Sequence, residues 1–126
     1  IPAIKQGLKP NSISTDLHTG SMNGGMKNIV NVMSKFLNMG IEIDEIIKST
    51  TWNPAKYIKR TDLGHLSVGA EADITLLNLR KGDFGFIDTQ GKRMKGNNLL
   101  ECELTIKAGK IVYDLNGLAS NEWRKK

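Results

Sequence analysis

The 126-residue sequence has little that could cross-link the chain, because it contains a single cysteine, Cys102. One cysteine excludes an internal disulfide and supplies no cysteine pair for a structural zinc site. This usage fits a reducing compartment, and we therefore expect the protein to be cytoplasmic. Aromatic residues make up only 6% of the chain, and none of them interleaves with basic residues as in many nucleic-acid-binding surfaces.

Long apolar runs and strong charge of one sign are also missing. Uninterrupted apolar stretches extend over a few residues, whereas a bilayer-spanning helix needs about 20. The formal net charge of +5 arises from 18 basic and 13 acidic residues, and the basic excess gathers in short groups around residues 56–60, 92–95 and 124–126. We expect these groups to be solvated surface, with neither nucleic acid nor a membrane as partner.

What is present suits one modest globular core, since 39% of the residues are hydrophobic and 25% are charged. The first residue, Ile1, is not an initiating methionine, and residues 1–8 look like the end of a structural element. We therefore expect the chain to be a C-terminal piece of a longer protein.

The first half of the sequence predicts a strand followed by helices. Residues 1–8 fit the last turns of a helix, and residues 11–16 form a short β-compatible run before a glycine-rich loop. Asp44 is the expected cap of a later short helix, and Asn53 with Pro54 the start of another. The apolar side chains of the main helix share one face at helical spacing, and Gly40 should end that helix: Met26, Ile29, Val30, Met33, Phe36 and Leu37.

A change of periodicity near Thr61 predicts a domain boundary, with one domain at 1–60 and a second at 61–126. Residues 74–79 carry apolar side chains on both faces, which is typical of a buried strand. Residues 100–107 alternate strictly, and a turn at 108–109 should join them to 110–113 in a hairpin. The glycine-rich segment 82–98 predicts one short strand and a long loop.

Asp16 is the first candidate for chemistry because it ends the β-compatible run and precedes a polar loop. A carboxylate in such a place can bind a cation or accept a proton from a metal-bound water. A plain turn or cap role remains the alternative, as does a surface role for His18. The loop at 20–25 could present backbone N–H groups to an anion, or it could simply be flexible. Cys102 fits a buried, unreactive position on a strand.

Four sequence blocks occur in an order that resembles the C-terminal third of amidohydrolase-superfamily enzymes. They are S-T-D-L-H at 14–18, T-W-N-P-A-K-Y-I at 51–58, G-H-L-S-V-G-A-E-A-D-I-T-L-L at 64–77 and T-I-K-A-G-K-I-V-Y at 105–113. The loop after Asp16 is most similar to the deacetylase and dihydroorotase-like branch. The resemblance implies an α/β fold: the end of a (β/α)8 barrel, comprising the last strand and following helices at 1–60, joined to part of a small β-sandwich domain.

The resemblance also implies a function and a site. The parent would be a metal-dependent amidohydrolase or deacetylase that hydrolyses non-peptide C–N bonds in amides or cyclic amides. Asp16 would be both a metal ligand and the general base, and the cofactor would be a divalent metal, with zinc expected. Contacts with a small-molecule amide substrate would come from the loop that follows: His18, Met22, Gly24 and Gly25.

The sequence departs from the family pattern in what it lacks. Only His18 and His65 are present, and His65 matches a connector position, not a ligand position. One carboxylate cannot make a zinc site of three or more ligands, so we expect this chain alone to be inactive and to bind no metal tightly. Two alternatives remain open: a deaminase of the same superfamily, and a non-catalytic β-domain that serves as a binding or assembly module.

Self-association is the last expectation from the sequence. A chain without the rest of a barrel should leave the apolar stripe of the 26–37 helix and the edge of the 11–16 strand in water. Exposed stripes and bare strand edges favour pairing with another chain.

Overall fold

A computed structural model describes residues 1–22 and 24–123 of the chain. It is a mixed α/β structure, as the sequence predicts. The elements in chain order are α1 (Pro2–Lys5), α2 (Ile29–Asn38), α3 (Ile43–Thr50), α4 (Trp52–Tyr57), β1 (Ile74–Ile87), β2 (Arg93–Lys107) and β3 (Lys110–Asp114). No helix in the described ranges is both long and apolar enough to cross a membrane.

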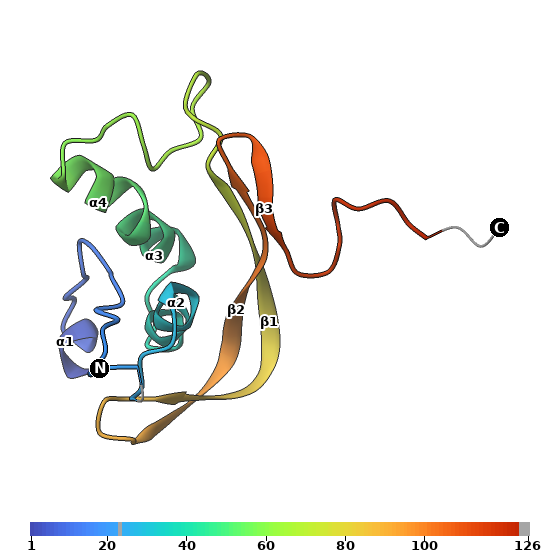
Figure 1. Cartoon of the computed structure of the whole chain (residues 1–126). Coiled ribbons are helices and arrows are strands. Elements are labelled where there is room, and N and C mark those ends of the chain that lie inside the picture. The colour runs from blue at the N-terminus through green and yellow to red at the C-terminus, as the bar shows by residue number, and fades with distance from the viewer. Residues whose placement is uncertain (23, 124–126) are drawn as a thin grey trace.

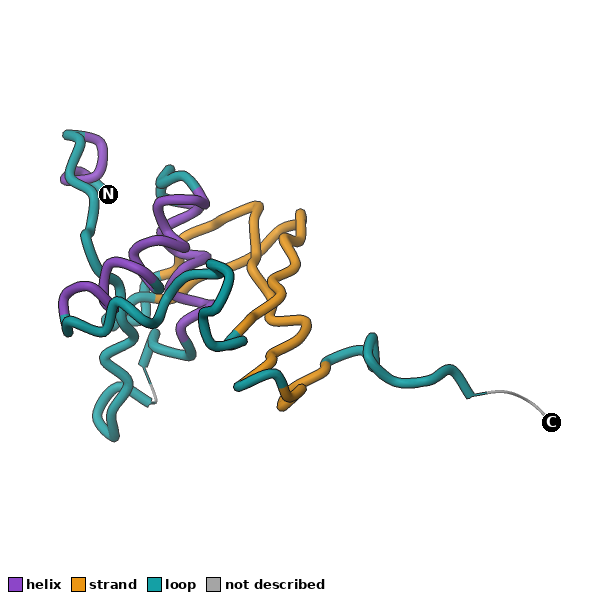
Figure 2. The backbone as a smooth tube through the Cα atoms, turned by 90° about the horizontal axis from the view of Figure 1, so that it is seen from above, coloured by secondary structure: helices purple, strands orange, loops and turns teal. Residues whose placement is uncertain are grey.

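The three strands form one antiparallel sheet in the order β1-β2-β3. Figure 1 shows the helices on one side of this curved sheet, with α2 nearest to the strands. Seen from above in Figure 2, helices and strands occupy separate layers, and the chain after β3 extends away from both. The described part of the predicted β-sandwich is thus a single sheet, and the predicted barrel end remains a prediction.

Helix α2 begins and ends where local chemistry requires. The Asn28 side chain caps it by accepting a hydrogen bond from the Asn31 N–H at 2.8 Å. Gly40 follows its C-terminus at a φ of +99° and donates to the Leu37 carbonyl at 3.1 Å, which confirms the predicted stop. The helix starts at Ile29, so Met26 lies in the loop before it.

The apolar stripe of α2 packs against the core, with Met33 buried and the other stripe residues of the helix partly buried. Met33 joins Ile41, Ile46 and Leu100 in a buried cluster. The partly buried side chains of α2 that pack against it are Ile29, Val30, Phe36 and Leu37. The buried Ser34 hydroxyl accepts a hydrogen bond from the Leu100 N–H of β2 at 2.9 Å. The expectation of an exposed α2 stripe is therefore wrong, because the sheet formed by the second half of the chain covers it.

Strands β1 and β2 form a hairpin much longer than the sequence suggests. The segment predicted as a loop at 82–98 is paired through most of its length, with register shifts after Leu76 and Lys81. Ladder hydrogen bonds depend on the backbone, so a strand can extend through glycines when its partner is already aligned. The turn is organised by Asp88, whose Oδ1 accepts from the N–H groups of Gln90 (2.9 Å) and Lys92 (2.8 Å).

The expectation of a buried strand at 74–79 is also wrong. Leu76 and Leu79 are 44% and 41% exposed, because β1 lies at the edge of the sheet and its outer face is uncovered. The second hairpin is confirmed. Ala108 and Gly109 make its turn with φ values of +48° and +76°, and the Ala108 N–H donates to Asp73 Oδ1 at 2.8 Å.

Residues 11–16 form no strand in the structure, although the sequence predicts one. Their backbone is linked to α3, where the Ile13 N–H donates to the Ser49 carbonyl at 2.9 Å. A strand requires a partner ladder, and the sheet lies on the far side of α2. The predicted boundary near Thr61 falls in a connector without helix or strand, and the two-domain division remains a prediction.

Two predicted helix caps are also incorrect. Helix α3 begins after Glu42, and Asp44 lies within its first turn. Helix α4 begins after Thr51, so Asn53 and Pro54 are inside it. The Asn53 side chain instead donates to the Asn11 carbonyl at 2.7 Å and so fastens the segment that leads to Asp16.

Candidate functional site

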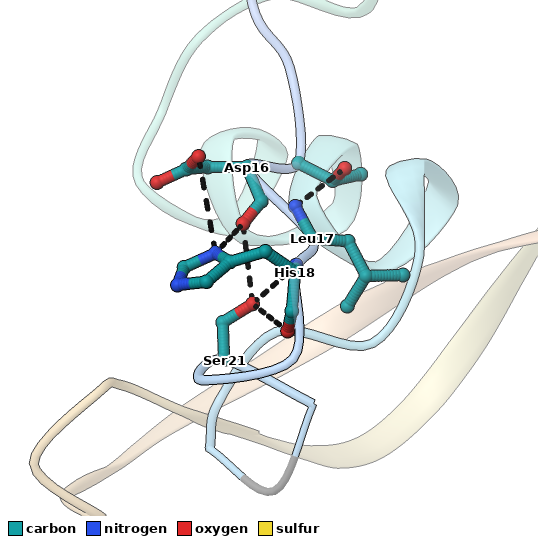
Figure 3. A network of polar contacts seen from close by, with 5 residues as sticks. Asp16, Leu17, His18 and Ser21 are labelled. Carbon is teal, nitrogen blue, oxygen red and sulfur yellow. Dashed lines mark hydrogen bonds and ion pairs between the residues drawn. The ribbon is translucent and has the colours of Figure 1, made fainter.

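Asp16 occupies a left-handed backbone conformation, with a φ of +49°. Aspartate tolerates this region better than most residues because its short polar side chain can bond locally. The conformation turns the chain so that the Asp16 carbonyl faces the following loop. It accepts hydrogen bonds from His18 Nδ1 at 2.7 Å and from the Ser21 hydroxyl at 3.1 Å (Figure 3).

Ser21 closes the turn between Asp16 and the glycines. Its Oγ accepts from the His18 N–H at 2.9 Å, and its own N–H donates to the His18 carbonyl at 2.9 Å. Its hydroxyl lies 3.1 Å from both the Asp16 and the His18 carbonyls, so its single proton serves one of them at a time. Sequence reasoning missed Ser21, although a serine in a glycine-rich loop is a known turn-forming signal.

The Asp16 carboxylate is left available by this arrangement. Its side chain is 89% exposed, and its Oδ1 lies 4.0 Å from His18 Nδ1. The 2.7 Å bond shows that the imidazole is committed to the backbone oxygen, not to the carboxylate. A carboxylate in this state can bind a cation, accept a proton or accept hydrogen bonds from a ligand.

His18 has one nitrogen committed and one available. The Asp16 carbonyl can only accept, so Nδ1 must carry the proton in this bond. In the neutral ring the lone pair then resides on Nε2, which fits an acceptor role toward a ligand. The side chain is 62% exposed, in agreement with such a role.

The other predicted substrate contacts, Met22, Gly24 and Gly25, differ in their exposure and in their hydrogen bonds. Met22 is 63% exposed, and its N–H donates to the His18 carbonyl at 3.1 Å. Gly24 donates to the Ser21 carbonyl at 3.0 Å. Gly25, in contrast, is buried against the β1–β2 hairpin, where a Cβ would collide with the Ile87 and Asp88 carbonyl oxygens.

Sequence reasoning also missed Lys35, in the last turn of α2. Its Nζ donates to the carbonyls of Gly25 and Ile87, each at 2.7 Å. Partial burial lowers the pKa of Lys35, while the nearby Asp88 opposes this effect and Lys27 adds to it. A single lysine in an amphipathic helix gives no sequence signal for such a role.

The His65 side chain packs against a neighbouring aromatic ring, which agrees with its predicted connector position. Its ring meets Trp52 edge-on, with centroids 5.5 Å apart, and its Nε2 lies 3.0 Å from the Thr61 carbonyl. In the ranges 1–22 and 24–123, no three His, Cys, Asp or Glu side chains are grouped to hold a metal ion. The donor set of Asp16 with one neighbouring imidazole therefore does not by itself fit a tightly held divalent metal.

The sequence profile of the amidohydrolase family matches residues 1–112. The chain belongs to the amidohydrolase family. The match includes the Asp16 turn, α2 and nearly all of the sheet, so the family assignment covers both halves of the chain.

Three similar proteins illustrate the relationship. A deacetylase of Brucella anthropi is 40% identical over 99 residues, which are 79% of this chain and 25% of that protein. The crystal structure of an adenine deaminase superposes with a TM-score of 0.82 at 30% identity and covers 89% of this chain. The crystal structure of a dihydroorotase superposes with a TM-score of 0.81 at 32% identity and covers 90%.

The chain is short beside these proteins. It spans 30% of each of the two solved chains and 25% of the Brucella deacetylase. As a member of a family of hydrolases that act on C–N bonds, it represents about a quarter to a third of the length of such relatives.

Proposed function

We propose that the protein carrying this sequence is a metal-dependent amidohydrolase that cleaves non-peptide amide or cyclic-amide C–N bonds. Membership of the amidohydrolase family and similarity to a deacetylase and a dihydroorotase support this class of reaction. The observation that carries the proposal is the 89% exposed Asp16 carboxylate, which is held at a left-handed turn and has only a long 4.0 Å contact with the His18 imidazole. The cytoplasm is the proposed compartment.

In this proposal Asp16 has two roles in the full-length protein. It would supply one carboxylate ligand to a divalent metal, with zinc expected, and the metal would supply Lewis acidity to the reaction. Asp16 would also take up a proton as general base. The further ligands would come from residues outside this chain, since the described residues lack a sufficient set. The 126-residue chain alone is therefore proposed to be inactive.

The loop after Asp16 would contact the substrate. The His18 side chain is 62% exposed, and its Nε2 could accept a hydrogen bond from a substrate amide N–H. Met22 offers an exposed apolar side chain in the same loop. Gly24 would contribute its close-lying backbone, whereas buried Gly25 would act by seating the loop on the hairpin.

A deaminase is the second candidate function. The specific observation in its favour is the adenine deaminase structure, which matches as well as the dihydroorotase structure does. The same aspartate would serve attack on a carbon that bears an exocyclic amine. If the protein is a non-catalytic β-domain module, the Asp16 turn has no catalytic function. Absence of turnover in the full-length protein would favour this alternative.

The test is an assay of the full-length protein, supplied with zinc, against N-acyl amino acids, dihydroorotate, hydantoins and adenine. Release of carboxylate from an amide or cyclic amide is expected, with loss of activity on chelation and recovery on adding metal back. Ammonia release from adenine alone would replace the proposal with the deaminase. Turnover that survives complete chelation would contradict metal dependence.

A further inference from the structure

Lys35 joins two segments that are far apart in the sequence. It lies in the last turn of α2, and its Nζ donates to the Gly25 carbonyl of the loop and the Ile87 carbonyl at the end of β1. Both distances are 2.7 Å, and both acceptors are main-chain oxygens. An amine on a flexible stem can satisfy two such acceptors at once, whether it carries two or three hydrogens.

The contact that Lys35 bridges is close-packed. Gly25 is buried, and a Cβ placed there would lie 2.6 Å from the Asp88 oxygen and collide with that of Ile87. The loop backbone therefore lies flush against the hairpin tip. Two carbonyl dipoles are brought close by this approach, and the Lys35 amine lies where both can be satisfied.

A chain of hydrogen bonds leads from this anchor to the candidate site. Gly24 next to the anchor donates to the Ser21 carbonyl at 3.0 Å. Ser21 in turn is bonded to His18 and to the Asp16 carbonyl. The loop is thus fixed at one end by Lys35 and at the other by the left-handed turn of Asp16.

We propose that Lys35 is a positioning residue, which fixes the loop bearing His18 and so the geometry of the Asp16 turn for reaction. It touches neither residue and acts through Gly25. The inference rests on the proposed function for its catalytic consequence, but its structural part can be tested without any activity. Because misplacement by about 1 Å can cost ~10²-fold in rate, loss of the anchor should lower turnover strongly.

The first experiment measures amide hydrogen exchange by mass spectrometry in the 126-residue chain. Lys35→Met removes the donors and keeps a stem of similar length. The matched control is Lys48→Met, because Lys48 is exposed in the last turn of α3 just as Lys35 lies in the last turn of α2. Exchange in residues 17–22 and 24–25 should rise at least about tenfold in Lys35→Met alone, while α3 and the middle of the hairpin are unchanged.

A rescue separates the lost amine from general damage. Lys35→Cys in a Cys102→Ser background leaves one thiol, which aminoethylation converts into a near-isostere of lysine. Protection of residues 17–22 and 24–25 should return on this treatment. Three results would each show that Lys35 does not anchor the loop. They are unchanged exchange in Lys35→Met, an equal change throughout the chain, and failure of the rescue.

The second experiment measures kcat and KM of the full-length protein per folded molecule. Lys35→Met should lower kcat about tenfold to a hundredfold, with Lys48→Met at the wild-type value. A lower melting temperature with unchanged kcat would reduce Lys35 to a structural role and overturn the inference. Absence of turnover in the wild type would overturn the proposed function, while the exchange result would still decide the anchor independently.

Discussion

The His18 Nδ1 atom lies 2.7 Å from the Asp16 carbonyl oxygen but 4.0 Å from the Asp16 carboxylate. The shorter contact joins the two residues through the backbone, and the contact with the carboxylate lies at the outer limit of an ion pair. The short hydrogen bond uses neither the Asp16 carboxylate oxygens nor His18 Nε2, which makes distinct roles for the two side chains chemically reasonable.

Asp16→Asn in the full-length protein should lower kcat by at least ~10²–10⁴, because an amide can neither accept the proton nor supply a charged ligand. Steady-state kinetics and circular dichroism measure the effect and check the fold. Asp44→Asn is the control, since Asp44 is an exposed helical carboxylate remote from the proposed chemistry. More than a tenth of wild-type activity in Asp16→Asn would rule out the assigned role.

Zinc should bind the 126-residue chain no more tightly than it binds a surface carboxylate. The described residues bring no three ligand side chains together, and two ligands do not make a stable zinc site. Isothermal calorimetry is expected to show millimolar or weaker binding that hardly differs in His18→Ala. A stoichiometric site of micromolar affinity would show that further side chains bind the metal, or that several chains form a site together.

Gly25→Ala should destabilise the chain by about 1–3 kcal/mol, because a Cβ would strike main-chain oxygens that cannot move aside freely. Gly24→Ala is the matched control: its Cβ would meet only the Ser21 oxygen, at 3.4 Å. Urea denaturation followed by circular dichroism gives both free energies of unfolding. Equal values for the two variants would show that the loop does not lie against the hairpin.

The Arg60–Asp62 pair should produce a measurable pH effect. A hydrogen bond from Arg60 lowers the pKa of Asp62 from 3.8 to about 2. Because the folded-state pKa is the lower one, the stabilising contribution is present above pH 3.8 and is lost as the pH falls through about 2. Carboxyl ¹³C NMR titration should show this midpoint, and Arg60→Met should return it toward 3.8.

Self-association of the 126-residue chain remains a prediction, but through a different surface from the α2 stripe. The edge strand β3 exposes Ile111 and Val112 at 51% and 60%, and its outer backbone groups offer a strand edge to a second copy. Light scattering should give a mass above 13.9 kDa at high concentration. Val112→Lys should restore the monomer mass, whereas a monomeric wild type would contradict the prediction.

Local chemistry made several features predictable from the sequence. The Gly40 stop and the turn at 108–109 depend on the φ preferences of glycine, whereas the strict alternation predicted for 100–107 is interrupted by a register shift at 102–104. The four blocks around Asp16 and the sheet likewise identified the family, which the match over residues 1–112 confirms.

Only the tertiary structure decided which surfaces meet. The sheet covers the α2 stripe, the hairpin extends through glycine-rich residues 82–98, and residues 11–16 remain unpaired. Each outcome depends on a partner distant in sequence, which periodicity does not encode. The Lys35 anchor also depends on residues distant in sequence. Its two acceptors are backbone carbonyls, which every residue possesses, so only the tertiary structure shows which two carbonyls Lys35 reaches.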